Sequence, residues 1–499
     1  MRKLAAGLCL ALLVPATPHA APAQPPKTKK AAPASAPTVL TIARPPTPEW
    51  FGLYVLGQKA GWSKASIRKE KRDGKAVLVG RAETSISAQV GPRSVTRSTY
   101  DEKVYEAKPG GRLVSFHARR TGDGGERELV GRCGAKECVV VITGEGQRQE
   151  RRIPHPGETA DDADAPRLAA ARRGLVTGWQ LEVDRLRAKR MEAKFLSREK
   201  VAAAGVEVPV SIVEERDVGP EGDRLATRVT IADDGRVLEI RIGDVVAKAE
   251  TEATAHRLDK VDLFGLTRVK LSKPLPQDVP ATLQYRIKGL PEAFRTDDPR
   301  QHYEAAGQGE ALVTVKAAIP ASADPTRDAP RGRAPEGQQA LLAATPEIDS
   351  DSPAIRKLAA EIVGDTPGVY AASRRIANAV FGRLEKAYGA SRDRASDVLA
   401  LGKGDCTEHT LLFTALARAS GIPARQVHGL VFARYDDGVP ALYWHAWPEV
   451  LSGQEWIALD PTFGQEVADA THIALGRGTQ VDTVSLLGAL QVLDVTRVQ

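Results

Sequence analysis

The stretch GDCTEHTLLFTALARASGIPAR at residues 404–425 decides how the C-terminal part of this chain folds. Asp405 and Glu408 have the spacing of a capping box around Cys406, with aspartate in place of the usual serine or threonine. Leucine and alanine follow at helical spacing until the run SGIP at 420–423 ends the pattern. The stretch therefore predicts a helix with Cys406 in its first turn, where free N–H groups and the helix dipole favour a thiolate.

Two strand-like segments downstream supply the other groups that a thiol nucleophile needs. The run YWHAW at 443–447 alternates, which places His445 and Trp447 on one face of a strand. Residues 455–460 (EWIALD) predict the next strand, which ends in Asp460. An antiparallel pair would bring this carboxylate to the imidazole. Cys406, His445 and Asp460 are therefore the candidate catalytic residues.

At these residues the sequence resembles the bacterial transglutaminase-like superfamily, which has a papain-like thiol fold. The resemblance covers roughly residues 346–480, and several blocks match in order. It implies Cys406 as nucleophile, His445 as general base and then acid, and Asp460 as the acceptor that orients the imidazole. The matching blocks are GDC (404–406), ALARASGIPAR (415–425), HAW (445–447) and DPTF (460–463), and DATH (469–472) is similar to the tail of one exported bacterial subgroup.

The resemblance also implies the chemistry, which is acyl transfer or hydrolysis on peptide or protein carboxamides through a thioester, with no cofactor and no metal. The backbone N–H of Cys406 is one expected oxyanion donor. A second donor is commonly an upstream side chain. Related cross-linking enzymes use a tryptophan there, but this domain has no tryptophan before Cys406, which leaves Tyr370 and Tyr388 as candidates.

Pro448 departs from the family pattern. Proline cannot donate a hydrogen bond to a neighbouring strand, so it is normally excluded from the middle of a sheet. We therefore expect the strand to bulge or to lie at an edge there, with Pro448 facing away from the His445 side.

The chain is long enough for several domains, and we expect an α+β protein in which a mainly antiparallel β region precedes the papain-like core. Turn signals between alternating segments predict the strands of the β region, whereas residues 167–173 and 184–191 are expected to be short helices. The expected divisions are a signal peptide (1–23), a disordered tether (24–48), the β region including the strand-like pieces 282–288 and 311–318 (49–319), a proline- and alanine-rich linker (320–345) and the catalytic domain (346–499).

The N-terminus predicts export. Arg2 and Lys3 precede an apolar run at 4–14 and then small residues, which is the form of a cleavable signal. The run is too short to anchor the mature protein in a bilayer, and no later segment is long and apolar enough to cross one. We therefore expect a periplasmic or extracellular protein without stable membrane insertion.

The cysteines point to the same compartment. Cys133 and Cys138 flank a short loop, and a disulfide across a hairpin is the expected pairing. Half of a zinc site is the competing interpretation, but no second Cys or His pair lies nearby in sequence. A disulfide would leave Cys406 as an unpaired thiol in an exported protein.

Helical spacing predicts two helices before the cysteine. Ser352-Pro353 and Thr366-Pro367 each have the form of an N-cap followed by proline at the first helical position. The apolar face of the second helix is expected to include Tyr370 and Phe381.

Charge argues against nucleic acid as a partner. The net charge is +7 with a pI near 9.1, but lysine and arginine are interleaved with aspartate and glutamate along most of the chain. A solvated surface of mixed charge is the better interpretation. A peptide or protein substrate is the expected partner, and the oligomeric state stays open.

Two other classes of function remain open on the sequence alone. In the first, the fold is catalytically idle and binds peptide or cell-wall material. In the second, Cys406 and His409 with His428 or His445 hold zinc, because residues three apart share a helix face. His409, His428 and His472 are otherwise expected to be structural histidines, and Trp447 either shields the His445–Asp460 contact or packs the sheet.

Overall fold

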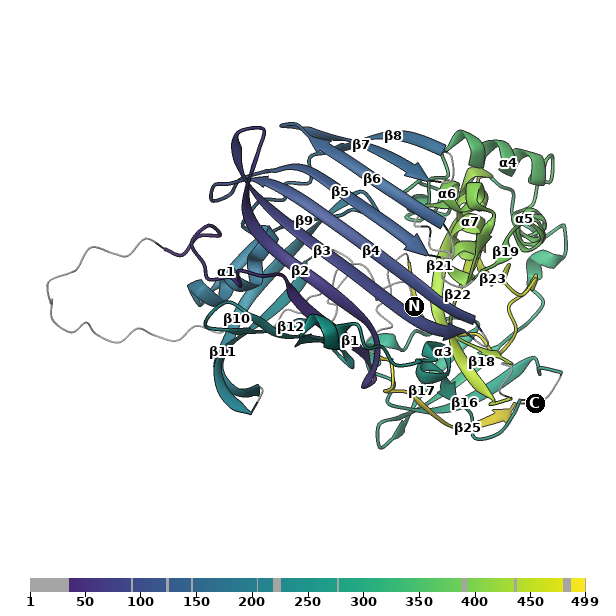
Figure 1. Ribbon diagram of the computed structural model, residues 1–499. Helices are drawn as coiled ribbons and strands as arrows, with labels where there is room; N and C mark the ends of the chain where they lie inside the picture. The colour runs from purple at the N-terminus through teal and green to yellow at the C-terminus, as the bar shows by residue number, and fades with distance from the viewer. Residues whose placement is uncertain are drawn as a thin grey trace, which may run out of the picture.

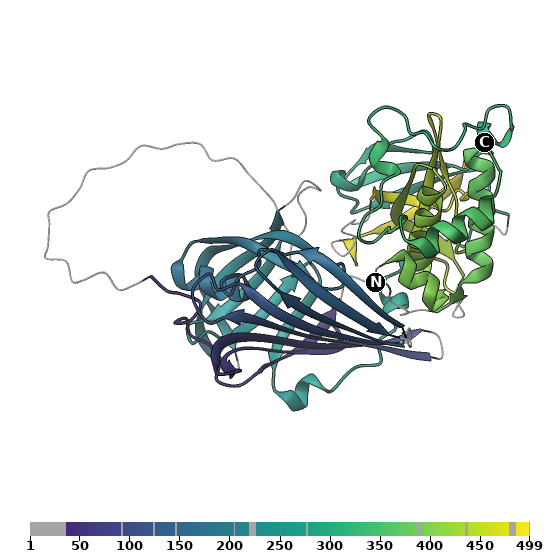
Figure 2. The same ribbon diagram turned by 90° about the horizontal axis from the view of Figure 1, so that it is seen from above.

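The computed structural model describes residues 36–498 apart from 91–92, 123–124, 145–146, 204, 219–225, 276–277, 388–391, 393, 435–437 and 479–485. The expected signal peptide lies outside the described residues, as does the first part of the expected tether. The chain forms a large curved sheet and a second part in which helices pack on smaller sheets, seen from two directions in Figures 1 and 2. No helix among the described residues has both the length and the apolar character needed to cross a membrane.

The first part is a fourteen-stranded sheet in the order β8-β7-β6-β5-β4-β3-β2-β1-β14-β13-β12-β11-β10-β9. Neighbouring strands in sequence pair antiparallel, and β1 closes onto β14 with Trp50 opposite Glu250. The expected antiparallel β region is therefore present. Its strands are β1 (Glu49–Val55), β2 (Gln58–Arg72), β3 (Lys75–Val90), β4 (Arg93–Glu106), β5 (Leu113–Gly122), β6 (Gly125–Cys133), β7 (Glu137–Gly144), β8 (Gln147–Pro154), β9 (Leu175–Glu182), β10 (Arg187–Ala203), β11 (Val206–Val218), β12 (Thr227–Ala232), β13 (Val237–Ile242) and β14 (Val245–Glu250).

One of the two short helices expected in this part exists. Helix α1 (Ala165–Arg172) packs Leu168 and Ala169 against buried residues of the sheet such as Met191 and Val213. The helix expected at 184–191 is wrong. Leu186 has a φ of 52° in the turn between β9 and β10, and Arg187 then pairs with Glu182 as β10 begins. Pairing between β9 and β10 therefore outweighs the local sequence pattern at 184–191, which favours a helix.

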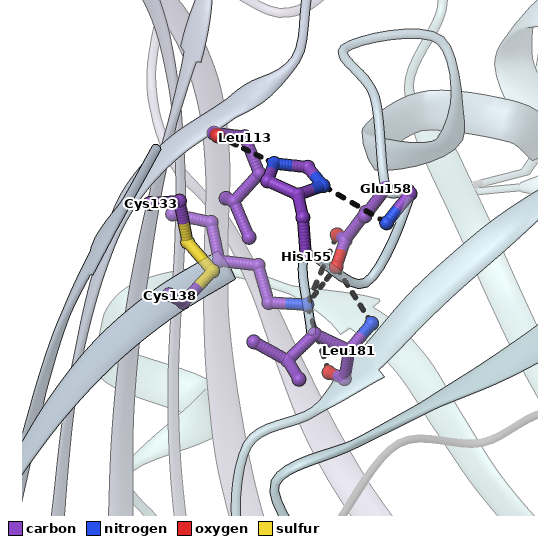
Figure 3. Close-up of a disulfide and its surroundings, with 8 residues drawn as sticks. Leu113, Cys133, Cys138, His155, Glu158 and Leu181 are labelled. Carbon is purple, nitrogen blue, oxygen red and sulfur yellow. Dashed lines mark hydrogen bonds and ion pairs between the residues drawn. A yellow bond between two sulfur atoms is a disulfide. The ribbon is translucent and has the colours of Figure 1, made fainter. Parts of the chain in front are cut away.

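The predicted disulfide is confirmed. Cys133 and Cys138 are opposite each other at the end of the β6–β7 hairpin and are bonded (Figure 3). Beside them, Glu158 accepts hydrogen bonds from Tyr105 Oη at 2.6 Å and from the Leu181 amide at 2.7 Å. The hairpin is thus fixed covalently at one edge of the sheet.

Residues 36–48 are packed against the sheet, although the sequence places them in a disordered tether. Val39 is fully buried, and Arg44 Nε lies 2.5 Å from Asp164 Oδ2. One buried apolar side chain and a partly buried ion pair hold a segment whose composition by itself favours disorder.

The second part is built around helix α7 (Cys406–Ala419). Helices α4 (Pro353–Val363), α5 (Val369–Arg383) and α6 (Ala395–Leu401) pack around α7, which itself contacts β22 (Figure 1). The shared core includes Ile376, Phe413 and Val450. The sheet has the order β15-β22-β21-β24 with β23 also paired to β22, and its strands are β15 (Val269–Lys270), β21 (Ala424–Ala433), β22 (Ala441–Ser452), β23 (Glu455–Ala458) and β24 (Ile473–Arg477).

A four-stranded sheet in the order β17-β18-β16-β25 packs on this unit. Tyr285 and Ile287 share a core with Leu430, Leu442 and Ile473 of the other sheet. The strands expected near 282–288 and 311–318 therefore exist, but they pack with the C-terminal part because β25, at the end of the chain, pairs with β16. The strands are β16 (Thr282–Lys288), β17 (Gln301–Gly307), β18 (Glu310–Lys316) and β25 (Gln491–Arg497).

Short elements complete the connections. Helix α3 (Leu263–Thr267) touches both the large sheet and β22, and Arg127 Nη2 lies 3.1 Å from Asp397 Oδ2 at the start of α6. Other short elements are α2 (Glu252–Ala255) and the parallel pair β19 (Glu385–Lys386) and β20 (Lys403–Gly404). The two parts thus meet at the segment that leads into α7.

The N-terminus of α5 differs from the sequence prediction. Its N-cap is Gly368, not Thr366, and the capping carboxylate comes from Asp328 in the expected linker. Asp328 accepts from the amides of Tyr370 at 2.8 Å and Ala371 at 3.0 Å, and a Cβ on Gly368 would lie 2.0 Å from this carboxylate. Phe381, expected on the buried face, is 44% exposed.

We expect Asp328→Ala to lower the free energy of unfolding of the C-terminal part by about 1 kcal/mol, because two amides of α5 lose their acceptor. Urea unfolding followed by tryptophan fluorescence measures the change. The matched control is Asp324→Ala in the same segment, since exposed Asp324 bonds only the nearby Thr326. Equal effects of the two substitutions would contradict the capping role.

Candidate active site

Cys406 is the first residue of α7, and the capping box predicted around it is present. Asp405 Oδ1 accepts from the Thr407 amide at 2.9 Å, and Glu408 Oε2 accepts from the Asp405 amide at 2.9 Å. Gly404 is required here by close packing, because a Cβ at 404 would lie 2.1 Å from Glu408 Cβ. Cys406 is half-buried and is the free cysteine of the described residues.

His445 bridges the thiol and the predicted carboxylate. It lies on β22, and its Nε2 is 2.8 Å from Asp460 Oδ2. Interaction with Cys406 also raises the pKa of this ring, and because Nε2 is already bonded to Asp460, Nδ1 is the nitrogen left for the thiol. The structure therefore brings Cys406, His445 and Asp460 into one continuous chain of contacts.

Pro448 positions Asp460. The β21–β22 register continues through the Gln426–Pro448 pair, so the expected bulge or edge is not found at this point. On its other side, Pro448 accepts from the Leu459 amide at 3.1 Å but has no N–H to return, and β23 ends at Ala458. Pro448 therefore donates no hydrogen bond to the segment after β23, at the point where the chain leaves the sheet and turns at Asp460.

The Asp460 carboxylate is fully buried and accepts four hydrogen bonds. Oδ1 accepts from the amides of Thr462 at 2.7 Å and Phe463 at 3.1 Å. Oδ2 accepts from His445 and also from His472 Nε2, which lies 3.0 Å away. The backbone turn therefore fixes one oxygen, and the other is shared by two imidazoles.

The charges of His445 and Asp460 stabilise each other. Burial by itself would lower the pKa of His445, but Asp460 and Cys406 outweigh it and raise that pKa to about 10. Burial would likewise raise the pKa of Asp460, yet the charge of His445 and the hydrogen bonds from His445 and His472 hold it well below its usual range. The site therefore favours an imidazolium beside an ionised carboxylate.

Aromatic rings enclose the imidazole. Phe463 stacks on His445 at 5.0 Å between centroids and is 40% exposed, whereas Trp447 is fully buried 6.1 Å from the same ring. Lys386 Nζ lies 5.9 Å from the Phe463 ring and 5.3 Å from that of Phe381. Trp447 thus shields the inner side of the imidazole, and an exposed aromatic and cationic rim borders its outer side.

His472, expected from the sequence to be a structural histidine, lies in direct contact with Asp460. Its Nδ1 lies 3.1 Å from Asp469 Oδ1, and the loop that bears both residues is held by Arg300, which donates to the His472 carbonyl at 2.9 Å. Gln301 also pairs with Ala474 through both its amide oxygen and its amide nitrogen. The run Asp469-Ala-Thr471-His472 was a usable signal, because Thr471 caps the Asp469 carboxylate and so fixes the turn.

The other histidines do not form the zinc site considered from the sequence. His409 is fully buried, its Nδ1 donates to the Asp405 carbonyl at 2.8 Å, and burial lowers its pKa, which favours the neutral ring. Within the described residues, the His, Cys, Asp and Glu groups that cluster closely enough for a metal are His445, Asp460 and His472, without Cys406 or His409. Their separations of 2.8 and 3.0 Å are those of hydrogen bonds, which account for the cluster.

The structure describes one of the two tyrosines considered as oxyanion donors. Tyr388 lies outside the described residues. Tyr370 is buried on α5, and its hydroxyl lies 3.5 Å from the Glu466 carbonyl. Packing accounts for Tyr370 without a catalytic role.

The C-terminal part thus places a cysteine at a helix N-terminus, a histidine on the adjoining sheet and a buried aspartate beyond it. Residues 356–461 match the family model of the transglutaminase-like superfamily, so the C-terminal part of the chain is a transglutaminase-like domain. The resemblance noted from the sequence and the α+β fold class are thereby confirmed.

No curated protein matches the sequence. A candidate cysteine protease from Cytophaga hutchinsonii has 17% identity over 44% of this chain and 83% of its own, with a TM-score of 0.30. A β-barrel-like protein of domain of unknown function DUF1849 from Brucella abortus has 10% identity over 41% of this chain and 94% of its own, also with a TM-score of 0.30.

We expect Asp460→Asn to slow the alkylation of Cys406 by iodoacetamide at pH 7 by about tenfold, because His445 then loses the partner that raises its pKa. The His445 ring is an imidazolium only below its own pKa. When that pKa falls in Asp460→Asn, the ring loses its proton closer to neutral pH. Alkylation rates measured from pH 5 to 10 test this, with Asp324→Asn as the exposed control. An unchanged rate profile in folded Asp460→Asn would contradict the coupling.

Proposed function

We propose that the protein is an exported thiol enzyme that cleaves peptide or protein carboxamides by acyl transfer, with hydrolysis as its main outcome. The observation that supports this most is the continuous contact from Cys406 at the start of α7, through His445, to the buried Asp460. A cysteine that served only packing would not require a fully buried carboxylate behind its histidine partner.

In the first step, the Cys406 thiolate attacks the carbonyl carbon of the substrate amide. The carbonyl π electrons move to oxygen, and the N–H of Cys406 is aimed at that oxyanion from the first turn of α7. His445 Nδ1 then gives its proton to the departing nitrogen as the C–N bond breaks, which leaves a thioester on Cys406.

In the second step, water attacks the thioester carbon while His445 removes a proton from it. The C–S bond breaks, the carboxylic acid leaves, and the thiolate beside the imidazolium is restored. Asp460 keeps the ring in one orientation through both steps, and buried Trp447 keeps water from the His445–Asp460 hydrogen bond.

Hydrolysis is favoured over cross-linking by the charge at the rim. Lys386 sits over Phe463, whose ring stacks on His445, so its ammonium lies beside the route by which a second amine would approach the thioester. Lysine side chains are cationic at neutral pH and would be repelled, whereas water would not.

Export is supported by the disulfide between Cys133 and Cys138, since such bonds persist in oxidising compartments. A periplasmic or extracellular location would present peptide and protein amides as substrates.

We expect the full chain to release ammonia or a new carboxylate from glutamine-containing casein, with little incorporation of a labelled primary amine. Cys406→Ala should lower both activities by at least about 10³-fold, because the nucleophile is lost. Label incorporation that exceeds hydrolysis would contradict the preference for water. Slow alkylation of Cys406 together with no turnover would favour a catalytically idle peptide-binding module.

We expect Lys386→Glu to raise the ratio of amine transfer to hydrolysis by roughly three- to tenfold, because an attractive charge replaces a repulsive one beside the imidazole. The ratio is measured with a cationic and with a neutral primary nucleophile, and only the cationic one should respond. Lys273→Glu, whose side chain is 81% exposed elsewhere, is the matched control. Equal responses to both nucleophiles would count against the charge effect.

A further inference from the structure

Behind the proposed triad lies a second histidine–aspartate pair, His472 and Asp469. His472, Asp460 and His445 are all buried, and the two histidine rings lie on either side of one carboxylate with their centroids 5.7 Å apart. Trp447 packs edge-on against His472 at 5.1 Å, and neither His472 nor Asp460 has exposed surface. The roles of His472 and Asp469 in this arrangement are not explained by the catalytic steps above.

The ring nitrogens of His472 face only hydrogen-bond acceptors. Nε2 lies 3.0 Å from Asp460 Oδ2, and Nδ1 lies 3.1 Å from Asp469 Oδ1 and 3.3 Å from the Asp469 carbonyl. A neutral imidazole has one donor and one acceptor nitrogen, so either tautomer would turn a lone pair toward an oxygen lone pair. Only the doubly protonated ring donates on both sides.

Neither carboxylate supplies the missing proton. Asp469 Oδ1 accepts from the amide and the hydroxyl of Thr471 at 2.9 and 2.6 Å, and its Oδ2 accepts from Gln465 Nε2 at 2.8 Å, so both oxygens already act as acceptors. Asp460 Oδ1 accepts from two backbone amides, and despite burial the charge of His445 holds the pKa of Asp460 well below its usual range. Both aspartates are therefore ionised at neutral pH.

We propose that His472 is a positioning residue, held as a buried imidazolium between Asp460 and Asp469, and that its positive charge limits how strongly Asp460 retains the proton on His445. The charges then alternate along the chain from Asp469 through His472, Asp460 and His445 to Cys406. The proposal rests on the proposed function only for its kinetic consequence, because the protonation of His472 does not depend on turnover.

This arrangement answers a problem in the mechanism. A fully buried carboxylate that served His445 alone would hold the imidazolium so firmly that the ring could not act as a base toward water. His472 shares with His445 the Asp460 oxygen that both rings bond, and it places a like charge near His445. His445 therefore releases its proton more easily. His472 thereby sets the pH range in which both steps can proceed.

The groups around His472 agree with a charge there. Asp460 and Asp469 face the ring nitrogens, and Trp447 covers one side. Arg300, from the segment before β17, donates to the carbonyls of Asp469 and His472 rather than to their side chains, so it competes with neither carboxylate. Gln465 Nε2 holds the second oxygen of Asp469 at 2.8 Å.

The protonation state is tested directly by NMR of the full chain labelled with ¹⁵N in the histidine rings. We expect both ring nitrogens of His472 to be protonated from pH 6 to 8, and the signals are assigned by their loss in His472→Gln. A neutral His472 with one unprotonated nitrogen in this range would overturn the proposal, whether or not the protein is an enzyme.

The kinetic consequence is tested with His472→Gln, whose amide can still donate to Asp460 but has no charge. We expect the alkaline limb of kcat/KM to move up by about one pH unit, because His445 then holds its proton more firmly. Asp469→Asn should also move the alkaline limb to higher pH, whereas Asp460→Asn should move it to lower pH. His302→Gln, on exposed β17, is the control and should leave the limb unchanged.

If His472 had a purely structural role, His472→Gln would lower kcat/KM without moving its alkaline limb to higher pH. An unchanged or lowered limb in folded His472→Gln would therefore overturn the proposal. If that variant does not fold, the His472 signals are assigned by their shift in Asp469→Asn, which removes an acceptor of Nδ1, and the alkaline limb of the same variant tests the kinetic consequence. Absence of any turnover would contradict the proposed function alone, since the NMR result would still stand.

Discussion

The structure of the C-terminal part depends on one buried negative charge. Asp460 has no exposed surface, and an ionised carboxylate in such a place is tolerated only when its oxygens are fully hydrogen-bonded. Two backbone amides satisfy one oxygen and two imidazoles satisfy the other. Removal of either histidine would leave a buried charge short of a partner, so the positions of β22 and of the loop that bears His472 are tied to the same atom.

The surrounding scaffold holds the partners of this carboxylate. Pro448 lies where β23 ends, which frees the chain to turn at Asp460. Gly429 allows β24 and Trp447 to approach β21, since a Cβ there would lie 1.9 Å from the Ile473 carbonyl and 2.9 Å from the Trp447 ring. The four-stranded sheet adds Arg300, which fixes the loop of Asp469 and His472. Segments that are distant in sequence therefore support one site.

The large sheet contacts this unit near the start of α6, through Arg127 and Asp397. Helix α6 leads directly into Gly404 and the capped turn of Cys406. This contact fixes the approach to the nucleophile from outside the catalytic domain, whereas Cys406, His445, Asp460 and His472 all come from residues after 400. The domain boundaries expected from the sequence stay a prediction, although β16 and β18 clearly pack with the C-terminal part.

The sequence by itself determined the local features. The capping box around Cys406, the face of β22 that presents His445 and the hairpin that joins Cys133 to Cys138 follow from spacing over a few residues. Only the tertiary structure decided which distant groups meet: Asp328 caps α5, Leu186 turns β9 into β10 where a helix was expected, and His472 shares the oxygen of Asp460 with His445. Helix caps and strand alternation are set by neighbouring residues, whereas burial of a shared charge depends on loops that the whole fold brings together.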